Sequence, residues 1–279
     1  MCGDETRLKE RDGAPTPKGA DVRLLRGAVV LLAFLAVAIP ATAEELARWD
    51  DPAGDDTGDG DYAYPLNEAF GEGGEADLLS FAIEKENGSL IFEFRIRNLV
   101  DPWNVGNRLT MVAVAVDTEE GGDLELRRNA NARLAEPSEY QIFAAGEIVE
   151  VIDAAAERVD IGASVETDLA AGTIRIRVPI DGIDGAAADW RFTPAVGLQD
   201  DYGAGGLGDF REVRKVADEW RGGGGDDLAI DANLYDIVVP EPRKILGIFG
   251  GRKRSQEDIL GDCSLETGQL VTLPALALE

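Results

Sequence analysis

The stretch LIFEFRIR at Leu90–Arg97 decides the fold class. Every second residue from Leu90 to Ile96 is apolar, and charged residues occupy most of the positions between them. A period of two is typical of a β-strand with one buried side and one side in water. The segment TIRIRV at Thr173–Val178 repeats the pattern. We therefore predict two strands, each with one face in a hydrophobic core.

Similar short apolar or alternating runs continue before and after Leu90–Arg97. Turn sequences such as Glu86-Asn87-Gly88 and Gly121-Gly122-Asp123 separate the apolar runs, and Phe210–Trp220 is the one short helix candidate. Short strands at this spacing predict an all-β chain that folds as an antiparallel β-sandwich with long acidic and glycine-rich loops. The predicted strands are Leu78–Glu84, Leu90–Arg97, Leu109–Asp117, Tyr140–Phe143, Ile148–Ile152, Arg158–Val165, Thr173–Pro179, Arg191–Leu198 and a last one within Val271–Leu278.

The N-terminal region is typical of a secretory signal peptide. Arg23 and Arg26 precede the apolar run Gly27–Pro40, and Ala41-Thr42-Ala43 matches an A-x-A cleavage site. The run of about 14 residues is shorter than the roughly 20 residues of a transmembrane helix, although an uncleaved anchor is the alternative. We expect residues 1–43 to be an N-terminal extension with a signal peptide and 44–279 to be one sandwich domain. The mature chain is then secreted or held at the cell surface, with no membrane span.

Composition excludes several classes of function. The chain has 54 acidic and 27 basic residues, a net charge of −27 and no histidine. Such a charge repels nucleic acid, and the absence of histidine removes Ser–His, Cys–His and histidine-ligated zinc chemistry. A glycosidase needs only two carboxylates, but no pair is singled out among so many. Cys263 alone follows the signal segment, so we expect no disulfide within the monomer.

A dense acidic loop is the candidate metal site. Six aspartates and three glycines alternate between Asp50 and Asp61, and their mutual repulsion would be relieved by a hard divalent cation. The spacing is not that of an EF-hand, so ligands must also come from elsewhere, and a solvated acidic hairpin is the alternative. The predicted calcium ligands are Asp51, Asp55, Asp56, Asp61 and Asp77.

Aromatic side chains in expected loops are the candidate ligand-binding residues. Sugar C–H faces stack on exposed rings, while neighbouring acids and amides take the hydroxyls; the alternative is that the rings seal the ends of the core. Trp103, between Asp101-Pro102 and Asn104, is the most loop-like of them. The predicted glycan-binding residues are Trp103, Tyr64, Tyr202 and Trp220.

Two groups of motifs resemble a known family. The string DPAGDDTGDGDYAYP at Asp51–Pro65 is the first, and Val178-Pro179, Gln199-Asp200 and EWRGGG at Glu219–Gly224 are the second. Together they resemble the C-terminal module of glucodextranases, a DOMON-like β-sandwich that also occurs at the end of some pullulanases and in cell-surface proteins. The resemblance covers most of the chain after the signal segment and implies a substrate-binding or cell-surface-attachment module.

These observations favour a secreted, non-catalytic module that binds a polysaccharide or a cell-surface glycan, with calcium in its acidic loop. Two alternatives remain: a small secreted glycosidase that uses paired carboxylates, and a structural envelope protein without a soluble ligand.

Overall fold

A computed structural model describes residues 43–182, 189–225, 230–240, 244–245, 248–249 and 254–278. All of them belong to one unit, Ala41–Glu279. The predicted signal peptide falls, apart from Ala43, outside the described residues. Across the described ranges, no helix combines the length and the apolar character needed to span a membrane.

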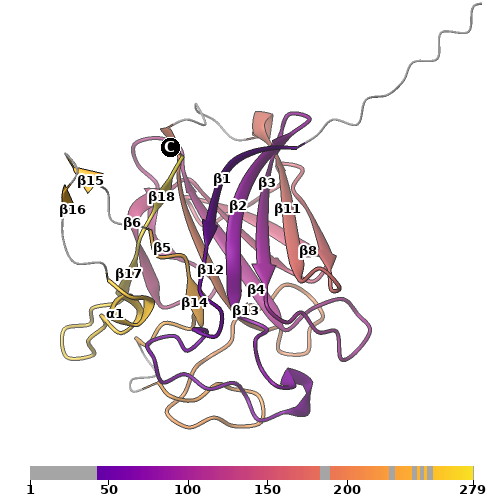
Figure 1. The fold of residues 1–279 in the computed structure, drawn as a ribbon, viewed down its shortest axis with the longest axis vertical. Helices are drawn as coiled ribbons and strands as arrows, with labels where there is room; N and C mark the ends of the chain where they lie inside the picture. Colours follow the sequence, from indigo (N-terminus) through magenta and orange to yellow (C-terminus); the bar gives the residue numbers. More distant parts are fainter. Residues whose placement is uncertain are drawn as a thin grey trace, which may run out of the picture. The chain divides into compact units, whose positions relative to one another are not determined.

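The first main sheet has five strands in the order β1-β2-β3-β11-β10, and every neighbouring pair is antiparallel (Figure 1). Asn87 and Gly88 both have positive φ, which allows the tight hairpin turn between β2 and β3. The strands are β1 (Glu44–Asp50), β2 (Leu78–Glu86), β3 (Ser89–Ile96), β10 (Ser164–Asp168) and β11 (Thr173–Pro179).

The second main sheet follows the order β13-β12-β4-β7-β8-β9, with β14 and β18 also paired to β12. All of these pairs are antiparallel. Its strands are β4 (Thr110–Asp117), β7 (Tyr140–Ala145), β8 (Ile148–Asp153), β9 (Arg158–Val159), β12 (Arg191–Asp200), β13 (Asp209–Phe210), β14 (Asp236–Ile237) and β18 (Leu276–Ala277).

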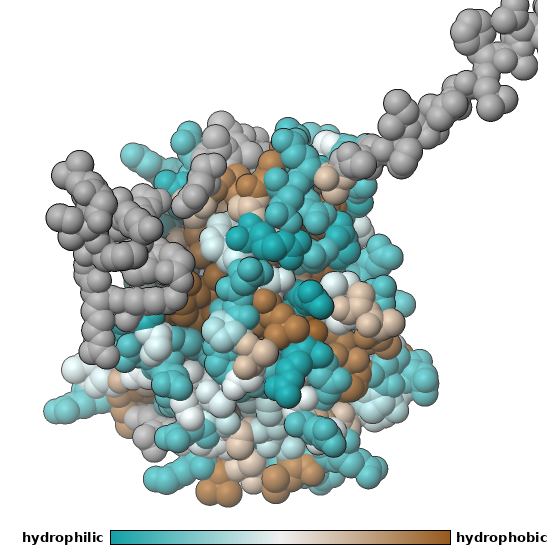
Figure 2. Space-filling model, in the orientation of Figure 1, coloured by the Kyte–Doolittle hydropathy of each residue, from teal (hydrophilic) through white to brown (hydrophobic). Residues whose placement is uncertain are grey.

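The two sheets enclose the larger core. Phe92 lies opposite Ile83 on β2 and Ile176 on β11, and its ring also contacts Phe192 of the second sheet. The opposite face of the five-stranded sheet carries ion pairs, such as that between Arg175 and Glu84 at 2.7 Å. On the face of the molecule seen in Figure 2, hydrophilic side chains predominate and hydrophobic ones form small groups. The predicted β-sandwich is confirmed.

A third layer covers the other face of the second sheet. Met111, Ala113 and Phe143 point into a second core, which a small sheet and the helix α1 close. Strand β4 is therefore buried on both faces, which explains why its sequence is uniformly apolar. The remaining elements are β5 (Asp123–Leu126), β6 (Ala132–Ser138) and β17 (Val271–Leu273), with β17 parallel to β6; the pair β15 (Lys244–Ile245) and β16 (Ile248–Phe249); α1 (Gln256–Leu260); and the 3₁₀ turns η1 (Glu68–Phe70) and η2 (Ile180–Gly182).

Most of the predicted strands are present, but the predicted helix at Phe210–Trp220 is wrong. Its backbone bonds to distant segments: the Arg211 N–H donates to Leu198 O at 2.6 Å, and the Val213 N–H donates to the Asn233 side chain at 2.8 Å. Tertiary hydrogen bonds thus override the local pattern. The prediction missed β1, β5, β6, α1 and the two-residue strands β13, β14, β15 and β16. Two predicted strands are divided, Arg158–Val165 into β9 and β10 and Val271–Leu278 into β17 and β18.

The two faces of β3 differ in their expected tolerance to mutation. Phe92→Ala removes a fully buried ring and should lower the free energy of unfolding by about 3–5 kcal/mol. Arg95→Ala, the matched control on the exposed face, should change it by less than about 0.5 kcal/mol. Urea denaturation measures both, and similar effects of the two substitutions would contradict this orientation of the strand.

Candidate functional site

Two long segments meet at one end of the sandwich, at the bottom of Figure 1. One connects β1 to β2, and the other lies between β12 and β14. Ala63 forms an isolated β-bridge with Gly223, and the Leu66 N–H donates to Asp218 O at 2.8 Å. Gly224 has φ +95°, and a Cβ there would lie 2.0 Å from Asp61 O. The glycines after Trp220 therefore allow two backbones to approach each other closely.

Three of the four predicted glycan-binding aromatics line one cleft of about 760 Å³: Trp103, Tyr202 and Trp220. Their exposed fractions are 46%, 69% and 36%. The rings of Trp103 and Trp220 are 6.4 Å apart between centroids and inclined by 35°. Residues more than a hundred positions apart in the sequence thus form one partly apolar, open surface.

An aspartate fixes each loop that carries one of these rings. Asp101 accepts the Val105 and Gly106 N–H groups at 2.9 and 3.0 Å, and Asp201 accepts those of Gly203 and Gly205 at 2.9 and 3.1 Å. Such side-chain acceptors stabilise turns.

The third of these aspartates, Asp218, accepts the Trp220 and Arg221 N–H groups, both at 2.8 Å. The bond from Trp220 is the main cause of its lowered pKa. Tyr202 itself holds a positive φ of 53°, a conformation that is rare outside glycine and concentrates at functional sites.

A buried arginine forms part of the wall between the rings. Arg211 is only 7% exposed, and it donates to Trp220 O at 2.6 Å and to Gln199 O. Its guanidinium lies 5.5 Å from the centre of the Phe70 ring, and its Nε has no hydrogen-bond partner among the described residues. Burial lowers its pKa. The sequence prediction missed Arg211, and nothing in its local sequence distinguishes it from the nearby Arg214 and Lys215.

The fourth predicted aromatic, Tyr64, is not in the cleft. Its hydroxyl donates to the Asp56 carboxylate and accepts the Ala76 N–H at 2.9 Å. Its ring lies 5.1 Å from that of Tyr235, and burial raises its pKa. Tyr64 and Asp56 thus connect the acidic loop to the segment that leads into β2.

Some of the predicted metal ligands do meet. Asp51 and Asp55 bring carboxylate oxygens within 4.8 Å of each other and of Asp236. Asp77 lies beside them, fully buried, and its Oδ2 accepts the Gly54 N–H at 2.8 Å and Arg97 Nη1 at 3.0 Å. Burial, followed by neighbouring acids such as Asp77, raises the pKa of Asp55 to about 6.

Asp56 and Asp61 lie outside this group. Asp56 is bound to Tyr64, and Asp61 is exposed. Asp236, which the sequence prediction missed, is fully buried and accepts the Leu78 N–H at 2.7 Å. Burial raises its pKa well above the usual range. The usable signal was the single acid inside the apolar run Leu234–Val239.

A comparison of the sequence with protein-family models identifies the family of this chain. The model described as the C-terminal binding module, SLH-like, of glucodextranase matches residues 46–275. This chain belongs to that family. No curated protein matches it. The resemblance predicted from the acidic string and the EWRGGG motif is therefore confirmed, and the match includes both the cleft and the aspartate group of the glucodextranase-type module.

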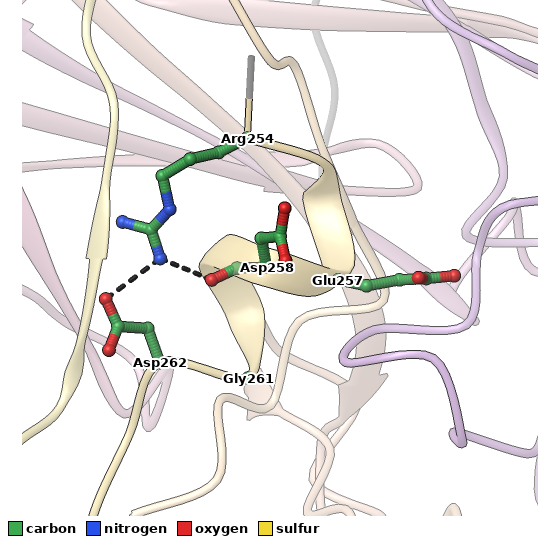
Figure 3. A pocket seen from close by; sticks show the side chains of 5 residues that line it. All are labelled: Arg254, Glu257, Asp258, Gly261 and Asp262. Atoms are coloured by element: carbon green, nitrogen blue, oxygen red, sulfur yellow. Dashed lines mark hydrogen bonds and ion pairs between the residues drawn. The ribbon is translucent and has the colours of Figure 1, made fainter. Parts of the chain in front are cut away.

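A second hollow of this module, beside α1, is smaller and polar (Figure 3). Arg254 points toward Asp262, 2.8 Å away, and also donates to Asp258 O. Glu257 points away from them (Figure 3) and approaches the acidic loop near Gly60. Cys263 is a free thiol whose pKa burial raises to about 11, so it is a weak nucleophile at neutral pH.

The turn at Asp218 can be tested separately from any ligand. Asp218→Ala removes the acceptor of two backbone N–H groups and should lower the free energy of unfolding by about 1 kcal/mol. Asp218→Asn keeps an oxygen in place and should retain most of that stability. Urea denaturation measures both, with acrylamide quenching of tryptophan fluorescence as a second readout that should increase only for the alanine variant. Equal behaviour of the two variants would contradict the assigned hydrogen bonds.

Proposed function

We propose that this protein is a secreted, non-catalytic carbohydrate-binding module of the cell surface, stabilised by calcium. A polysaccharide or surface glycan binds in the cleft formed by Trp103, Tyr202 and Trp220. The observation that carries the proposal is the convergence of these exposed rings from three separate loops beside the buried Arg211. Membership of a binding-module family supports the same conclusion.

The chemistry of the cleft fits a sugar. Flat rings that are partly in water offer apolar faces to sugar C–H groups, while polar groups at the edge bond to hydroxyls. Arg108 and Arg221 add donors, and Asp200 and Asp201 add acceptors, around the same opening. The aspartate-fixed turns hold the rings before ligand arrives, which lowers the entropic cost of binding.

The acids of the cleft support binding rather than hydrolysis. Glycoside hydrolysis needs one carboxyl group that donates a proton and a second one opposite the scissile bond. Asp201 is engaged by its own turn, and Asp200 accepts the Tyr202 N–H at 3.0 Å and lies 3.5 Å from Arg211. Both carboxylates are thus already engaged within the protein as hydrogen-bond acceptors or ion-pair partners. Glu75, whose pKa burial raises to about 7, is fully enclosed and does not line the cleft.

Glycan binding should depend on the tryptophans. Trp103→Ala and Trp220→Ala should each weaken binding about tenfold or more, because removing an aromatic anchor costs about 2 kcal/mol. Leu265→Ala, which also removes an exposed apolar side chain but lies outside the cleft, is the control and should bind normally. A glycan array followed by titration calorimetry measures the effect. Unchanged affinity in both tryptophan variants, or release of reducing sugar by the parent protein, would overturn the proposal.

Export is a separate part of the proposal. Arg23, Arg26, the apolar run Gly27–Pro40 and the Ala41-Thr42-Ala43 end all support it. Mass spectrometry of the native protein should find an N-terminus near Glu44. A chain that keeps residues 1–43 and stays in the cytoplasm would contradict both the export and an extracellular ligand.

A further inference from the structure

Four aspartates meet beneath the acidic loop, and three of them lie at strand ends. Asp51 follows β1, Asp77 precedes β2, and Asp236 begins β14. Asp55 comes from the loop itself. Carboxylate oxygens of Asp51, Asp55 and Asp236 lie within 4.8 Å of one another, and Asp77 accepts the N–H of Gly54, the residue directly before Asp55, at 2.8 Å. The acids therefore come from parts of the chain that are distant in sequence.

Several oxygens of this group lack a protein partner. Asp77 and Asp236 are both 0% exposed. The Oδ1 atoms of Asp55, Asp77 and Asp236 have no hydrogen-bond partner among the residues that the structure describes. A buried carboxylate oxygen without a partner carries an uncompensated desolvation cost. Such costs in one place indicate that a ligand completes the site.

The described residues supply little positive charge here. Arg97 bonds to Asp77 from the solvent side, while Glu257 of α1 contributes further repulsion on Asp55. A single guanidinium does not balance four carboxylates. A divalent cation would offset two more of the negative charges, and the unpartnered oxygens would coordinate it directly.

Calcium is the cation that fits this donor set. It binds six to eight oxygens at about 2.3–2.6 Å in flexible geometry, whereas magnesium requires a near-ideal octahedron and retains several waters. All the donors are carboxylate oxygens, and the group contains neither sulfur nor nitrogen ligands, which copper and zinc favour. Carboxylates from separate segments leave room for water to complete the shell.

We infer that Asp51, Asp55, Asp77 and Asp236 form a single calcium site that fastens the acidic loop to the ends of β1, β2 and β14. The inference rests on the calcium part of the proposed function and names its ligands, one of which sequence reasoning did not find. Neighbouring contacts place the loop without the cation: Gly58 N donates to Tyr235 O at 3.0 Å, and Gln256 donates to Asp55 O. The site is thus formed in advance.

The test is thermal unfolding of the full chain in chelator and in calcium, at constant ionic strength set with sodium chloride. Calcium at a hundredfold excess over its Kd should raise the Tm by about 5–10 °C, and titration calorimetry should give one strong site per chain. Magnesium at the same concentration should give a much smaller shift. Asp236→Asn and Asp55→Asn should each lose the calcium-dependent shift. In chelator they should unfold at or above the Tm of the parent, because each removes one charge from a repelling group.

Asp61→Asn is the matched control, since it makes the same change of charge at an exposed position of the same loop. It should keep the full calcium shift. If Asp236→Asn and Asp55→Asn respond to calcium like the parent, the assigned site is wrong while calcium stabilisation stands. A parent that shows no shift overturns both. If Asp61→Asn loses the shift as well, the effect belongs to the loop as a whole and the four-ligand site is rejected. Glycan affinity, measured separately, is not decided by any of these outcomes.

Discussion

The burial of the second sheet on both faces is the constraint on which the rest of the structure depends. One face of β4 and β12 packs against the five-stranded sheet, and the other faces the third layer. Because neither face meets water, these strands are almost entirely apolar, and their polar residues are displaced to the strand ends. The polar residues of the candidate sites therefore lie where the strands end, such as Asp200 at the end of β12 and Asp236 at the start of β14.

That arrangement explains why the two candidate sites share one end of the sandwich. The connection between β1 and β2 and the segment that follows β12 both run over this end (Figure 1). Their contacts at Ala63–Gly223 and Leu66–Asp218 are backbone hydrogen bonds, which depend on close approach rather than on particular side chains. The glycine run 222–225 permits that approach. The EWRGGG motif thus combines an exposed ring with the backbone freedom needed to position it.

The sequence predicted the fold well where periodicity was the governing signal, as in Leu90–Arg97 and Thr173–Pro179. It failed at Phe210–Trp220, where hydrogen bonds to Leu198 and Asn233 determine the backbone. For the candidate sites, residue type and loop position were sufficient to predict that Trp103, Tyr202 and Trp220 lie exposed in loops, but not that they line one cleft. Tyr64, Asp56 and Asp61 have the same character in the sequence, but their place depends on which way a glycine-rich loop turns. Asp236 and Arg211 come from distant segments, so only the tertiary structure brings them into place.

The buried aspartates and the cleft are connected through a short series of contacts. Asp55 is adjacent to Asp56, which accepts from Tyr64. The neighbouring residues bond to the segment that carries Trp220, Ala63 to Gly223 and Leu66 to Asp218. The repelling carboxylates of Asp51 and Asp55 and the contacts near Trp220 thus involve one continuous segment, the connection between β1 and β2. Water screens the repulsion among the acids at the surface of the chain, but it does not screen the repulsion among the buried acids around Asp236. The cost of burying them is therefore concentrated in the segment that also contacts the turn before Trp220.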